Sequence, residues 1–180
     1  MTRREALLSL TALLGGAVFG AGRFLAGPPV AGDLPTKPLL TAADLDLLEE
    51  VAETIVPATA ASGGAKAAKV GMFIAEIARD YYDPAERALL TTAPRFFAEE
   101  TATHFPGRDF PSLSAAERHA LLLAIDRRQP QPPVYQMVKQ LTLWGYWTSE
   151  VAAKEALTYL PVPGVYRGCV EVPPGTKALF

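Results

Sequence analysis

The chain has 180 residues, of which 49% are hydrophobic, and a formal net charge of −2. This length allows one domain with an apolar core. The 17 basic and 19 acidic residues are mixed along the chain, with no basic stripe that could follow a phosphate backbone, so no nucleic acid is expected as a partner.

Two adjacent arginines, Arg3 and Arg4, precede an apolar run from Ala6 to Phe19. A charged start followed by an apolar stretch of this length is typical of an export signal, and paired arginines predict the twin-arginine route. The run is shorter than the roughly 20 residues of a spanning helix. An ordinary secretory leader, or an uncleaved anchor that continues to Val30, stays open as an alternative. We expect residues 1–31 to form the signal peptide and the start of a linker.

Apolar residues at helical spacing predict an all-α fold for residues 32–160, as a single helical domain of four to six helices. A first helix should begin at Thr41 and end at Pro57. A second should cover Ala65 to Tyr82, with Tyr81 turned inward.

Capping residues and prolines place the later helices. Asp83, which precedes a proline, predicts a new helix start, and Pro94 should kink or break the apolar face that follows. The stretch from Ser114 to Glu117 is a capping box that begins another helix. The last helical stretch is expected from Val134 to about Tyr159, with an interruption near Gly145.

Residues 161–180 are rich in proline and glycine, which exclude a helix, and yet they are also apolar. A tail this apolar differs from a solvated disordered tail. It should lie extended along its own helices or along another chain. We therefore predict an extended, proline-rich C-terminal arm.

The sequence carries no recognisable catalytic motif. His104 and His119 lack the spacing partners that a metal site needs, and neither a dinucleotide loop nor a nucleophile elbow is present. The adjacent carboxylates Glu49 and Glu50 point in different directions on a helix, so they form no dyad. We predict no catalytic, metal-binding or cofactor-binding residue, and no cofactor on this chain.

Aromatic residues gather towards the C-terminus and include Trp144, Tyr146, Trp147, Tyr159 and Tyr166. Tyrosine and tryptophan are enriched at protein interfaces, because they bury a large area and keep one polar group. The alternative is an aromatic core around the last helix. Both interpretations hold equally for the two tryptophans, whereas the place of Tyr166 in the arm favours an interface with a partner.

Two C-terminal segments carry a resemblance to a known family. The stretch from Leu143 to Glu150 resembles a G-Y-[YW]-T-S-E signature, and the stretch from Tyr159 to Cys169 resembles a Y-x-P-V-P-G-x-Y-x-G-C segment. The stretch from Phe105 to Ser114 is similar to F-G-K-x-F…L-S, with Pro106 as a departure. Together these segments resemble the gluconate 2-dehydrogenase subunit 3 family, over roughly residues 45–180.

The resemblance implies the non-catalytic small subunit of a periplasmic dehydrogenase for a sugar or an alcohol. The partner that it implies is a large FAD-dependent subunit of the glucose–methanol–choline (GMC) oxidoreductase class, often joined by a multihaem cytochrome c subunit. This chain would be the export escort, or chaperone, that takes the flavin subunit through the twin-arginine translocase. The complex would work in the periplasm or at the outer face of the cytoplasmic membrane. The alternative is a stand-alone exported enzyme or binding protein with an unrecognised site.

Cys169 is the only cysteine, so no disulfide can form within the chain. In an exported protein a lone cysteine is a free thiol or half of a bridge to another chain. The place of Cys169 in the arm favours an interchain disulfide with the flavin subunit. A free thiol and a homodimer bridge stay open as alternatives.

Overall fold

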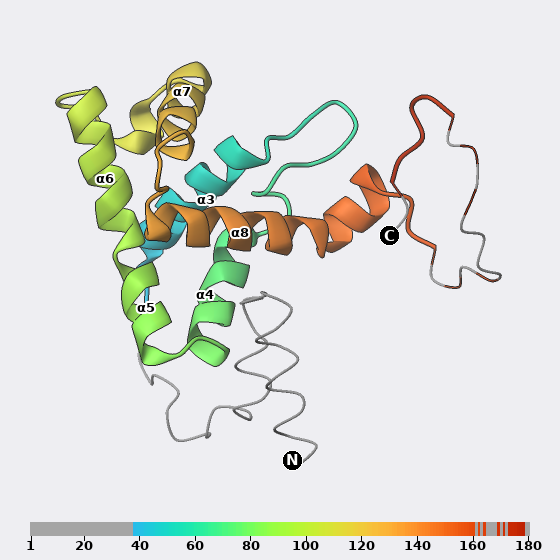
Figure 1. The fold of residues 1–180 in the computed structure, drawn as a ribbon, viewed down its shortest axis with the longest axis horizontal. Helices are drawn as coiled ribbons and strands as arrows, with labels where there is room; N and C mark the ends of the chain where they lie inside the picture. Colours follow the sequence, from blue (N-terminus) through green and yellow to red (C-terminus); the bar gives the residue numbers. More distant parts are fainter. Residues whose placement is uncertain are drawn as a thin grey trace, which may run out of the picture. The chain divides into compact units, whose positions relative to one another are not determined.

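The computed structural model describes residues 38–160, 162, 164, 169, 171 and 173–178. These residues contain six α-helices, a 3₁₀-helix and a π-helix, and no β-strand (Figure 1). The predicted all-α class is therefore confirmed, with the helix number at the upper end of the expected range. The predicted export signal at Arg3 and Arg4, and Tyr166 of the arm, lie outside the described residues.

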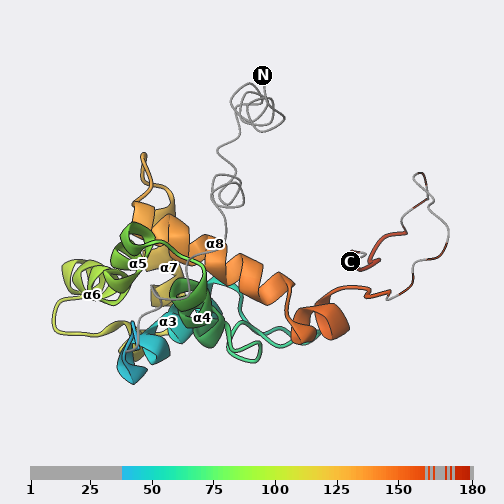
Figure 2. The same cartoon turned by 90° about the horizontal axis from the view of Figure 1, so that it is seen from below.

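The elements follow one another in a single unit, Pro35–Phe180. In chain order they are α3 (Ala42–Ile55), α4 (Val70–Asp80), α5 (Pro84–Thr91), α6 (Ala93–His104), η1 (Phe110–Ser112), α7 (Ala115–Asp126), α8 (Pro133–Trp147) and η2 (Ala152–Ala156). The long helix α8 contacts α3, α4, α5, α6 and η2, whereas α7 packs on α3 and α6 (Figures 1 and 2). Since α3 in turn contacts α4, α6, α7, α8 and η1, the fold is arranged around α3 and α8.

The core forms where apolar helix faces meet. On α8 the buried positions Val134, Val138, Leu141 and Gly145 repeat at helical spacing, which gives one continuous apolar stripe. Phe97 of α6 is fully buried. Its ring centroid lies 6.3 Å from that of Phe110 and 6.5 Å from that of Tyr135. Three elements thus meet at one aromatic centre, because aromatic pairs at this separation pack favourably.

The predicted helix caps are confirmed. The side chain of Thr41 accepts a hydrogen bond from the amide of Asp44 at 3.2 Å, and that of Asp83 accepts one from the amide of Glu86 at 2.8 Å. Each of these first-turn carboxylates accepts a bond from the cap amide in return, which completes a capping box. The break predicted at Pro94 is also present, because α5 ends at Thr91 and Pro94 lies in the first turn of α6.

The predicted second helix was too long. α4 begins at Val70 instead of Ala65, because Lys69 takes the left-handed backbone conformation, with φ 53° and ψ 44°. Residues 65–69 form turns, and these are held by α3: the amide of Lys66 donates to the carboxylate of Glu53 at 2.8 Å. Tyr81, predicted to face inward, is 61% exposed, since the helix ends at Asp80. At the start of α4, a contact with α3 therefore overrides helical periodicity.

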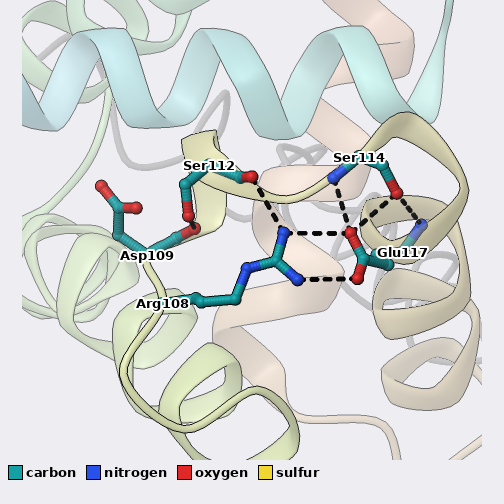
Figure 3. Close-up of polar contacts among 5 residues, drawn as sticks. All are labelled: Arg108, Asp109, Ser112, Ser114 and Glu117. Carbon is teal, nitrogen blue, oxygen red and sulfur yellow. Dashed lines mark hydrogen bonds and ion pairs between the residues drawn. The ribbon is translucent and has the colours of Figure 1, made fainter.

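The segment between α6 and α7 is held by Arg108, as Figure 3 shows. Its guanidinium donates to both carboxylate oxygens of Glu117, at 2.7 and 3.1 Å, and to the carbonyl of Ser112 at 3.0 Å. The same carboxylate accepts bonds from the amide and the hydroxyl of Ser114, at 2.8 and 2.7 Å. One side chain thus joins the capping box of α7 to the preceding loop through a bidentate pair, the stronger form of such contacts.

We expect the stability of the fold to depend on pH through Glu117. Its hydrogen bonds with Arg108 and Ser114 lower the pKa of this carboxyl from 4.5 to about 2. A lowered folded-state pKa adds stability that is complete above the unfolded value and is lost as the pH falls through the folded value. The change Glu117→Gln should therefore lower Tm by about 2–4 °C at pH 7. The difference from the wild type should shrink between pH 5 and pH 2 in thermal unfolding followed by circular dichroism.

The matched control is Glu99→Gln. Glu99 pairs with Arg95 four residues earlier on the exposed face of α6 and caps no helix. Exposed pairs of this kind add little stability, so its Tm should follow that of the wild type at every pH. An equal and pH-independent loss in both variants would contradict the role assigned to Glu117.

Candidate partner-binding surface

The last two turns of α8 expose both tryptophans of the chain. Trp144 is 56% exposed and Trp147 is 43% exposed, whereas Tyr146 is 2% exposed. Residues three apart share a helix face and residues two apart point in nearly opposite directions. The spacing of these aromatics therefore places the tryptophan rings outside and the tyrosine ring in the core.

Trp144 rests on α4 through Phe73. Their ring centroids are 5.8 Å apart and the planes meet at 81°, the edge-to-face arrangement that aromatic rings prefer. This approach depends on Gly145, because a Cβ atom at that position would lie 2.6 Å from the Phe73 ring. Met72, the neighbour of Phe73 on α4, is 53% exposed. α4, which packs against α8, therefore carries an exposed apolar side chain of its own, Met72.

Tyr146 joins α8 to the loop between α3 and α4. Its hydroxyl donates to the carbonyl of Gly63 at 2.9 Å and lies 3.3 Å from the hydroxyl of Ser62. The amide of Gly63 donates to the carboxylate of Glu155 on η2 at 2.7 Å. The loop therefore bonds to two elements far along the chain, α8 and η2. The bond from Tyr146 holds the C-terminal end of α8 against this loop.

The beginning of this loop is held by α3. The carboxylate of Glu53 accepts bonds from the amides of Ala58 and Lys66, at 2.9 and 2.8 Å. A Cβ atom at Gly64 would lie 2.4 Å from the same carboxylate, so the loop needs glycine there. Glu53 thus satisfies backbone donors that follow the end of α3, where no helix partner is available.

The described part of the C-terminal segment returns to the end of η2. The amide of Thr158 donates to the carbonyl of Ala178 at 2.8 Å, and the Lys177 ammonium donates to the carbonyl of Glu155. Near this point Tyr159, Leu160 and Val162 are 53%, 48% and 81% exposed. We define the C-terminal strip as these three residues.

The structure separates the five aromatic residues that the sequence brings together. Trp144 and Trp147 lie on an exposed face, Tyr159 lies in the C-terminal strip, and Tyr166 is outside the described residues. Tyr146 is a core residue, so it offers no exposed ring to a partner. Closeness in the sequence does not distinguish exposed from buried aromatic residues. The positions of Trp144, Tyr146 and Trp147 around the axis of α8 do.

Sequence reasoning did not single out Met72, nor the contact between Phe73 and Trp144. The available signal was a glycine between aromatic residues at the end of the last helix, which indicates a close approach by another side chain. Cys169 is exposed, as are His119 and His104, and the Nδ1 of His104 lies 2.9 Å from the carbonyl of Glu100.

The described residues offer neither a cluster of metal ligands nor a membrane-spanning helix. No group of three or more histidine, cysteine, aspartate or glutamate side chains among them is placed to hold a metal ion. None of the helices in the described part of the chain has the length and hydropathy to cross a membrane.

Comparison with known proteins gives one match. The model of the family described as gluconate 2-dehydrogenase subunit 3 matches residues 42–164. These residues run from the start of α3 to just beyond the C-terminal strip. No curated protein and no solved structure matches the chain.

We expect a substitution at Gly145 to destabilise the fold more than a substitution at the exposed Trp144. Gly145→Ala forces a Cβ atom against the Phe73 ring and should destabilise the fold by about 1–3 kcal/mol, although alanine alone favours a helix. Trp144→Ala removes a largely exposed ring and should cost less than about 1.5 kcal/mol, the scale of one aromatic pair. Urea unfolding of both variants measures the difference. A Gly145→Ala protein more stable than the wild type would contradict the close contact.

Proposed function

Because the chain belongs to the gluconate 2-dehydrogenase subunit 3 family, we propose that it is the non-catalytic small subunit of a FAD-dependent dehydrogenase for a sugar or an alcohol. The match of residues 42–164 carries this proposal, since it covers the helical domain and the C-terminal strip. The family is one of subunits of a dehydrogenase complex, so this chain is an accessory subunit that associates with others.

The proposed partner is the large subunit of the GMC oxidoreductase class. That subunit would hold FAD and the substrate pocket, and this chain would hold no cofactor. A multihaem cytochrome c subunit is a further partner in the same proposal. Support comes from the exposed rings of Trp144 and Trp147, since exposed aromatics of this size are enriched at protein interfaces. Tyr159 and Tyr166 belong to the proposed interface, whereas Tyr146 supports it from the core.

Export is the second part of the proposal. Arg3 and Arg4 stand before an apolar run in the pattern of a twin-arginine signal. A flavin subunit without its own signal could reach the periplasm only if it were already bound to a chain that has one. The small subunit would therefore be an escort that brings the folded partner through the twin-arginine translocase, and the complex would work in the periplasm.

Changing Arg3 and Arg4 together to lysine tests the escort role. The change keeps the charge and removes the guanidinium pair, so both this chain and the flavin subunit should stay in the cytoplasm. Immunoblots of the two subunits in periplasmic and cytoplasmic fractions measure the outcome. Arg23→Lys, in the same leader, is the matched control and should leave export unchanged. A flavin subunit that still reaches the periplasm with the double variant would show that the escort role is wrong.

Cys169 gives a second test, of the proposed link between the subunits. Its thiol is exposed in the described structure, and an exposed thiol in an oxidising compartment can bridge to another chain. We expect native complex on a non-reducing gel to give a band at the summed mass of the two subunits, which thiol reagent splits. Cys169→Ser should abolish that band and weaken association, because the bridge makes docking intramolecular. Separate subunits from the wild type without reductant would exclude the bridge.

A further inference from the structure

We draw no further inference here: the strongest candidate, the exposed apolar face of α7 formed by Ala116, Ala120, Leu123 and Ala124, carries none because nothing in the described part of the structure shows what covers it.

Discussion

The hydrogen bond from the buried Tyr146 hydroxyl to the Gly63 carbonyl is the contact on which the arrangement around α8 depends. A buried polar group that loses its partner costs more than the bond itself contributes, so this contact fixes α8 against the loop that follows α3. Fixing the tyrosine inside also determines the rotation of the helix end. Trp144 lies two residues before it and Trp147 one residue after it, so neither tryptophan shares its helix face and both rings lie outside.

Charged side chains provide the second set of constraints, and several of them lie on α7 or just after it. Burial opposes the charge on Glu50, but Lys66 and Arg118 outweigh it and lower the pKa of this carboxyl, which ties α7 to α3. Arg128, just after α7, makes two bonds to Glu100 of α6, at 2.6 and 2.5 Å. The helix itself buries only Leu121, Leu122 and Ile125. Burial of these three side chains supplies most of the stabilisation of α7, and the partly exposed ion pairs add less and orient the helix against α3 and α6.

Local signals predicted most of the fold, and contacts between distant residues account for the rest. The boxes at Thr41, Asp83 and Ser114 could be predicted because a capping side chain and its partner lie three residues apart in the sequence. The turn before α4 could not, because it depends on carboxylates of α3 that lie more than a dozen residues away. The candidate surface divides in the same way: residue type identified the aromatics, but only the structure distinguished Tyr146 from Trp144. The contact between Phe73 and Trp144 escaped prediction because it depends on the space that a glycine on another helix leaves.

The positions of Tyr146 and of the C-terminal strip explain how a small subunit can keep exposed apolar residues without weakening its own fold. The core is complete without the tryptophan faces or the strip, since its large fully buried side chains come from other positions. The strip meets the body through hydrogen bonds at η2, and η2 is itself tied to the loop beside Tyr146 through Glu155. Hydrogen bonds of both side chains and backbone thus connect the strip to the body, while apolar side chains stay available for a partner. Such preorganisation is what binding by a short, apolar segment requires, because flexible segments lose affinity when they become ordered.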